Sequence, residues 1–166
     1  MPEALPNTQS NPMKRFLTPL FSLLLLATFI VTGCSNNSRI IATGLEVEIT
    51  GVERESDGSV AVSWQIKNPN IAPYMFSRLN HKIQLNGVTL GSITDLQALP
   101  VPANSNAGRT SKLTTLDAAA NRAVTEAINA GSANYRIETQ ITILVYDESV
   151  EKSNLSNSGT VTVKTK

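Results

Sequence analysis

Residues 59–70 read Ser-Val-Ala-Val-Ser-Trp-Gln-Ile-Lys-Asn-Pro-Asn, and this stretch decides the fold class. Its large apolar side chains stand on every second residue, at Val60, Val62, Trp64 and Ile66. Because successive side chains of a strand point to opposite faces, this period of two predicts a half-buried strand with Trp64 in the core. Pro69 has no N–H to donate, so the strand is expected to end there.

The same alternation recurs on both sides of this stretch. Residues 79–85 alternate again, and Asn86-Gly87 supplies the two positive-φ positions of a type I′ turn before a short strand at 88–90. The acidic residues 53–58 are expected to form the turn of another hairpin. Further strands are predicted at 40–52, 112–116, 135–146 and 159–165.

One segment has helical rather than strand periodicity. Residues 118–130 are rich in alanine, Asp117 precedes them as a candidate N-cap, and Gly131 suits a left-handed stop. Residues 100–108 contain Pro100 and Pro102 and are expected to form a loop. About seven strands and one helix predict a mainly β domain over residues 39–166, an immunoglobulin- or fibronectin-III-like antiparallel β-sandwich.

Residues 1–33 have the features of an export signal, with Met13 as the expected start. Lys14 and Arg15 precede the apolar residues 16–31, which are fewer than the ~20 that a spanning helix needs and are interrupted by polar residues and a proline. The stretch ends in Val31-Thr32-Gly33-Cys34, which resembles the lipobox of bacterial lipoproteins, so Cys34 is the expected lipid attachment site.

Cys34 is the only cysteine of the chain, so no internal disulfide can form. Acylation explains a lone thiol in an exported protein, and two or three acyl chains anchor a protein stably. Residues 34–38 would then be the lipidated cysteine and a short tether. The residue after the cysteine is Ser35 and not an aspartate. In this respect the sequence resembles lipoproteins that are sorted to an outer membrane. These features predict a protein of the bacterial cell envelope, anchored in the outer membrane and facing the periplasm.

The charge balance argues against a polyanionic partner. The chain has 14 Lys and Arg against 13 Asp and Glu, and removing residues 1–33 leaves 12 of each. With 41% hydrophobic and 16% charged residues the chain is expected to be folded. Its near-neutral charge predicts that it binds no nucleic acid. We also expect it to be a monomer. Acyl chains on Cys34 would make the membrane its partner.

The strand ending in Asn68-Pro69-Asn70, followed by a hairpin with Asn86-Gly87, resembles the type 2 late embryogenesis abundant (LEA) family and its WHy (water stress and hypersensitive response) domain. The resemblance runs from about Leu45 to Leu116. It implies a non-catalytic sandwich that protects proteins or membranes in desiccation or other stress. The residues themselves first predict a turn, because asparagine side chains bond nearby backbone groups.

Two candidate sites have a simpler interpretation. His81 is the only histidine and shares a strand face with Leu79 and Ile83, which favours a packed or edge histidine over a catalytic or zinc-binding one. Residues 53–58 imitate the first half of a calcium loop, but its twelfth position is Trp64 rather than a bidentate glutamate. We therefore expect no catalytic residues, no metal and no cofactor.

Tyr74, Met75 and Phe76 follow the Asn-Pro-Asn motif and are predicted to lie in a loop. This apolar cluster either tucks under the sandwich or stays exposed as a candidate contact loop for lipid or unfolded protein. Two alternatives to stress protection stay open. One is a lipid-binding or lipid-carrying module, and the other is an envelope assembly or scaffold lipoprotein that offers an edge strand to a partner.

Overall fold

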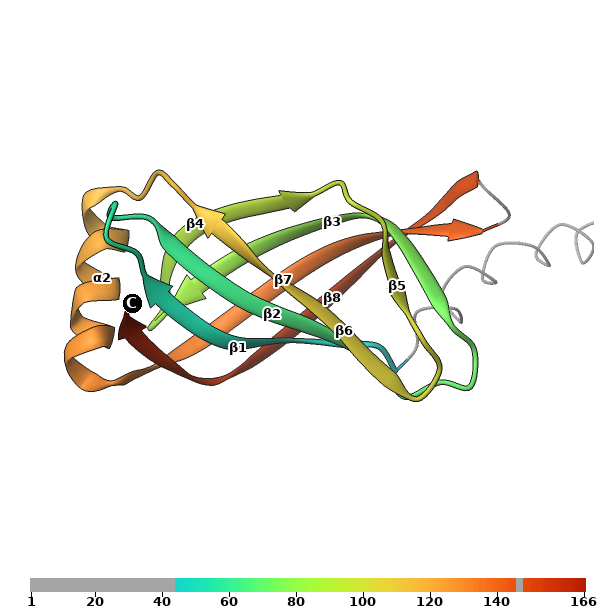
Figure 1. The fold of residues 1–166 in the computed structure, drawn as a ribbon, viewed down its shortest axis with the longest axis horizontal. Coiled ribbons are helices and arrows are strands. Elements are labelled where there is room, and N and C mark those ends of the chain that lie inside the picture. Colours follow the sequence, from blue (N-terminus) through green and yellow to red (C-terminus); the bar gives the residue numbers. More distant parts are fainter. Residues whose placement is uncertain (1–43, 146–147) are drawn as a thin grey trace, which may run out of the picture. The chain divides into compact units, whose positions relative to one another are not determined.

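The computed structural model describes residues 44–145 and 148–166, which belong to one compact unit. This part is mainly β with one helix, as predicted (Figure 1). In chain order its elements are β1 Glu46–Arg54, β2 Val60–Asn68, β3 Tyr74–Leu85, β4 Val88–Asp95, β5 Leu99–Val101, β6 Ser105–Leu113, α2 Ala118–Ala130, β7 Ser132–Val145 and β8 Glu148–Thr165.

The described strands form one curled, eight-stranded sheet that resembles half a barrel. Seven of them follow the order β4-β3-β7-β8-β1-β2-β6, and β5 pairs with β3. The pair β1–β8 is parallel, with Val52 opposite Val163, so the prediction of a wholly antiparallel arrangement is wrong for this pair. An immunoglobulin- or fibronectin-like sandwich is not confirmed, because hydrogen bonds join the strands in a single path.

The core lies inside the curl of the sheet. Trp64 is 1% exposed, and its indole N–H donates to Ser111 Oγ at 3.2 Å. The strand predicted around it is confirmed, with its apolar residues buried as the alternation requires. The two edge strands β4 and β6 approach one another, and Arg109 of β6 closes the gap through an ion pair with Asp95 of β4 at 2.7 Å. Arg109 also donates to the carbonyl of Gln97 at 2.8 Å.

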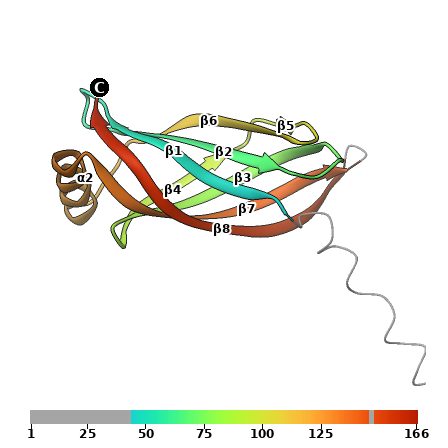
Figure 2. The same ribbon diagram turned by 90° about the horizontal axis from the view of Figure 1, so that it is seen from below.

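Helix α2 covers one end of the half-barrel (Figures 1 and 2). Its predicted ends are confirmed: Asp117 accepts a hydrogen bond from the Ala120 N–H at 2.7 Å, and Gly131 has a φ of 74°. Small side chains on one face of the helix let it pack closely against the strands. The buried helix residues are Ala120, Ala123, Val124 and Ala127.

Strands β5, β6 and β8 differ from the sequence prediction. Residues 100–108 are not one loop, because β5 occupies Leu99–Val101 and β6 begins at Ser105. Strand β5 was missed since it has three residues and contains a proline, which only an edge position tolerates. Strand β8 begins well before residue 159, at Glu148, because its polar first half is held by a long ladder with β7 rather than by its own hydrophobic pattern.

Candidate functional site

The candidate site is the end of the half-barrel that carries the Asn-Pro-Asn motif, opposite helix α2 (Figure 1). Two segments form it, residues 69–75 and residues 100–104, and together we call them the tip. Backbone pairing of β3 with β5 joins the segments, with Tyr74 opposite Val101 and Met75 opposite Pro100. The Asn104 N–H also donates to the Asn70 carbonyl at 3.0 Å. The tip is therefore one connected surface.

The side chain of Asn68 hydrogen-bonds to both segments of the tip. Its side chain is 1% exposed, and its amide donates to the carbonyls of Ala72 at 2.8 Å and Pro102 at 3.0 Å. Its Oδ1 accepts the Asn70 N–H at 3.0 Å. A buried amide with donors and acceptor all used stabilises a turn far better than the same group in water. Asn68 thus fixes both segments of the tip at once.

The described chain begins beside this motif. A Cβ built on Gly44 would lie 3.5 Å from Pro69 Cγ and 3.7 Å from Asn70 Oδ1. Gly44 has a φ of 84°, a conformation that glycine adopts at little cost. Gly44, the first described residue, therefore lies at the tip end and not at the helix end.

The predicted contact loop Tyr74, Met75 and Phe76 is wrong as a loop, because these residues open strand β3. Phe76 is fully buried in the core, Tyr74 packs against the core while partly exposed, and Met75 is 37% exposed. Sequence reasoning missed Ile71, which is 90% exposed. The sequence did carry a signal for this residue. Ile71 lies between Asn70 and Pro73, and it is not part of an alternating apolar pattern that would place it in a strand.

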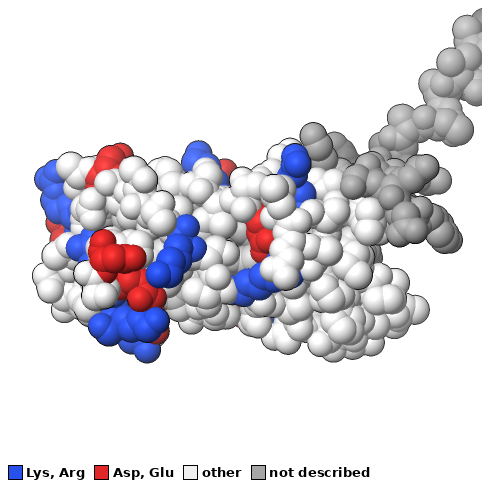
Figure 3. All heavy atoms as spheres, turned by 45° about the horizontal axis from the view of Figure 1, so that its top comes forward, with Lys and Arg blue, Asp and Glu red and all other residues white. Residues whose placement is uncertain are grey.

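A shallow apolar groove of about 370 Å³ lies at the tip. Its lining residues come from β3, β5, β7 and the residues next to β3 and β5, and they are Pro73, Tyr74, Met75, Pro100, Val101, Pro102 and Leu144. Neither segment of the tip contains a charged residue. Figure 3 shows the acidic and basic side chains mainly on other parts of the visible face, and the described surface that is visible at this end is largely free of them.

The other two motif residues, Asn86 and Gly87, lie at the opposite end in the β3–β4 turn. Both have positive φ, 47° and 82°, as a type I′ turn requires. The Asn86 N–H donates to the Asn134 carbonyl at 2.7 Å, and Asn86 Oδ1 accepts the Asn134 N–H at 3.0 Å. These bonds dock the turn on the start of β7, so Asn86 and Gly87 are structural and do not join the tip.

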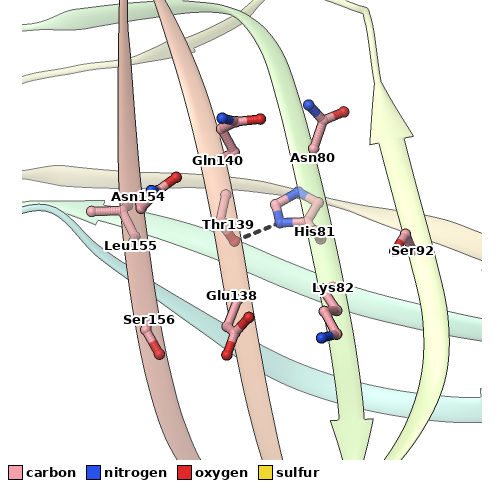
Figure 4. A pocket seen from close by; sticks show the side chains of 10 residues that line it. All are labelled: Asn80, His81, Lys82, Ser92, Glu138, Thr139, Gln140, Asn154, Leu155 and Ser156. Atoms are coloured by element: carbon pink, nitrogen blue, oxygen red, sulfur yellow. Dashed lines mark hydrogen bonds between the residues drawn. The ribbon is translucent and has the colours of Figure 1, made fainter.

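His81 is an interior residue, as its strand face predicts. Its Nδ1 is hydrogen-bonded to Thr139 Oγ1 at 2.8 Å (Figure 4). Its ring centroid is 4.2 Å from that of Trp64. Burial lowers the pKa of His81 from 6.5 to about 4, against a smaller opposing effect of Asp95. A groove of about 430 Å³ adjoins this pair. With threonine as its bonded neighbour and a neutral ring, His81 serves packing.

The acidic turn at residues 53–58 uses its carboxylates internally. Glu53 pairs with Lys164 at 2.9 Å, and Glu55 pairs with Lys166 at 3.3 Å. Asp57 accepts the Ser59 N–H at 2.9 Å, and bonds to Ser59 lower the pKa of Asp57. No cluster of three or more His, Cys, Asp or Glu side chains able to hold a metal ion occurs among the residues that the structure describes.

The lipobox residues Val31, Thr32 and Gly33 and the expected attachment site Cys34 lie outside the described residues, as does the expected leader. Across residues 44–145 and 148–166, no helix has the length and apolar character needed to cross a membrane.

No protein-family model matches the chain. The curated proteins give no match either. Among solved structures, the chain is similar to a protein from Archaeoglobus fulgidus, with 19% identity, a TM-score of 0.39 and coverage of 73% of this chain and 96% of that one.

Two further solved structures are similar to this chain. One is a candidate late embryogenesis abundant protein, with 13% identity, a TM-score of 0.46 and coverage of 91% of this chain and 87% of that one. The other is an Arabidopsis thaliana protein, with 14% identity, a TM-score of 0.45 and coverage of 72% and 78%.

Proposed function

We propose that this chain is a non-catalytic, lipid-anchored protein of the bacterial envelope that protects proteins or membranes during desiccation or other stress. The observation that carries the proposal is the buried Asn68. The resemblance to the WHy domain rests on Asn68-Pro69-Asn70 at a strand end, and there the Asn68 amide binds the carbonyls of Ala72 and Pro102. The motif thus builds a defined surface, as a domain that acts by contact requires.

The anchor is the first part of the proposal. Acyl chains on Cys34 would hold the protein in the outer membrane, facing the periplasm, and explain the single thiol of the chain. Replacing Cys34 by serine in the full chain is expected to abolish labelling by a radioactive fatty acid and to leave the precursor unprocessed. Equal labelling of the parent and Cys34→Ser would refute the anchor.

Protection is the second part. A folded domain with a near-neutral charge does not shield other molecules as a disordered hydrophilic chain does, so protection requires contact with exposed apolar surface. The exposed side chains Ile71 and Met75 are the groups able to make such contact at the tip. The contact surface is therefore centred on Ile71 and Met75 and excludes the buried Phe76.

The test measures how much activity a fragile enzyme keeps after drying and rehydration with residues 35–166, which include the whole compact unit. An equal mass of an inert globular protein is the baseline. Protection above that baseline, reduced by the pair Ile71→Ser and Met75→Ser but not by Leu96→Ser, is expected. Leu96 is a matched control because it is 64% exposed and lies outside the tip. Protection no better than the baseline would refute the stress role.

A lipid-binding or lipid-carrying module is the second candidate, and the apolar groove at the tip is the observation that favours it. Its volume of about 370 Å³ falls at the lower end of ligand-binding pockets. This candidate predicts that lipid co-purifies with residues 35–166 and that Met75→Ser reduces its amount. Envelope assembly through an added strand is less favoured, because Arg109 and Asp95 link the two edge strands to each other.

A further inference from the structure

We propose that the tip enters the boundary between headgroups and acyl chains of the membrane that anchors the protein, so that the domain stands end-on against the bilayer. This inference rests on the proposed anchoring. Its first basis is the place of Gly44, the first described residue, which lies against Pro69 and Asn70. Nine residues lie between Cys34 and Gly44, and the ten residue steps from one to the other span at most about 36 Å when fully extended. An anchor at Cys34 therefore reaches the domain at the tip.

The second basis is the chemistry of the exposed surface there. The segments 69–75 and 100–104 contain no charged residue, and their exposed side chains are mostly apolar. Ile71 is almost completely exposed, which is unfavourable in water and favourable against lipid. The exposed residues of the tip are Pro69, Ile71, Ala72, Pro73, Met75, Pro100, Pro102 and Asn104.

The third basis is the backbone of the tip. A chain segment that leaves water must bond its polar backbone groups internally, since unpaired N–H and C=O groups are costly there. Four of the exposed residues are prolines, which have no N–H to lose. The carbonyls of Ala72 and Pro102 accept from the Asn68 amide, and the Asn70 carbonyl accepts from the Asn104 N–H. Hydrogen bonds from Asn68 and Asn104 therefore satisfy backbone carbonyls in both segments, as a less polar layer requires.

The charge distribution points the same way. The acidic turn and the C-terminal lysines form ion pairs between β1 and the end of β8, at the helix end of the domain. A domain held end-on by its tip keeps these groups in water. An orientation lying flat on the sheet would bring ion pairs such as Lys67–Glu48, at 2.6 Å, against the bilayer and would cost their hydration.

The test uses the full chain, purified with its anchor and reconstituted into phosphatidylcholine vesicles. In one set of vesicles the acyl chains carry bromine near the headgroup, which quenches indole fluorescence on contact. The variant Ile71→Trp reports on the tip, and Leu96→Trp is the matched control at an exposed apolar position elsewhere. The parent supplies the baseline of Trp64, which is buried. Melting temperatures equal to the parent's show that both variants fold.

The expected result is that bromine removes most of the fluorescence added by Ile71→Trp and little of that added by Leu96→Trp. Equal emission of Ile71→Trp in both kinds of vesicle would overturn the inference while the anchor stands, because flotation with the vesicles is measured first. Equal quenching of both variants would also overturn it, since the domain would then lie flat. A full chain that does not float with the vesicles refutes the anchor and the inference together.

Discussion

Lowering the pH from 7 to 5 is predicted to destabilise the domain through His81. The pKa of His81 is about 4 in the folded protein, because burial disfavours the charged ring, and its ordinary value is 6.5. Between these values the unfolded chain binds a proton that the folded chain does not. The contribution of the neutral, buried His81 ring to the free energy of unfolding is therefore fully present above about pH 6.5. It is lost as the pH falls toward 4.

The size of the effect follows from the two pKa values. The free energy of unfolding should fall by about 2 kcal/mol between pH 7 and pH 5, and by about 3 kcal/mol when pH 4 is reached. The carboxylates of Glu48 and Glu53 do not obscure the effect of His81 between pH 7 and pH 5. The pKa values of Glu48 and Glu53 are lowered from 4.5, mainly by hydrogen bonds to Lys67 and Lys164, so their stabilisation is lost only at lower pH.

The assay is urea unfolding at pH 7, 6 and 5, followed by far-ultraviolet circular dichroism. The comparison is with His81→Gln, a variant of similar volume with an amide that does not titrate. The parent should lose about 2 kcal/mol over this range and the variant little. Parallel losses in both proteins would refute the reasoning. His81 is the only histidine of the chain, so one NMR resonance reports its titration, and a midpoint near 6.5 would also refute it.

Three substitutions test the packing on which the site depends. Asn68→Ala leaves the carbonyls of Ala72 and Pro102 without their buried amide donor and should cost about 3 kcal/mol in urea unfolding, whereas Asn106→Ala, at an exposed amide, should change stability by less than about 0.5 kcal/mol. Gly108→Ala places a Cβ 2.0 Å from the Trp64 carbonyl and should cost about 3 kcal/mol, while Gly51→Ala, with its nearest neighbour at 3.9 Å, should be tolerated; similar melting temperatures for the two would contradict the β2–β6 contact. Asp117→Ala removes the N-cap of α2 and should cost about 1 kcal/mol, and an unchanged midpoint would show that the cap contributes nothing.

Sequence reasoning succeeded where the relevant physics is local. Alternation of apolar residues predicted β1, β2 and the part of β3 from Leu79 to Leu85, because a strand and a core face repeat with the same period. The type I′ turn at Asn86-Gly87 and the ends of α2 at Asp117 and Gly131 follow from backbone preferences of single residues. The site was found only in part, since the Asn-Pro-Asn motif was recognised and Ile71 was not.

The sequence by itself therefore determined a mainly β domain with one helix, its principal strands and its turns. Tertiary structure decided that β5 pairs with β3, that Phe76 is buried and that residues 69–75 and 100–104 form one tip. These outcomes depend on pairing between segments far apart in the chain, and no local preference encodes such pairing. Asn68 shows the difference clearly: its place before Pro69 predicts a turn, but only the fold brings the Pro102 carbonyl within reach of its amide.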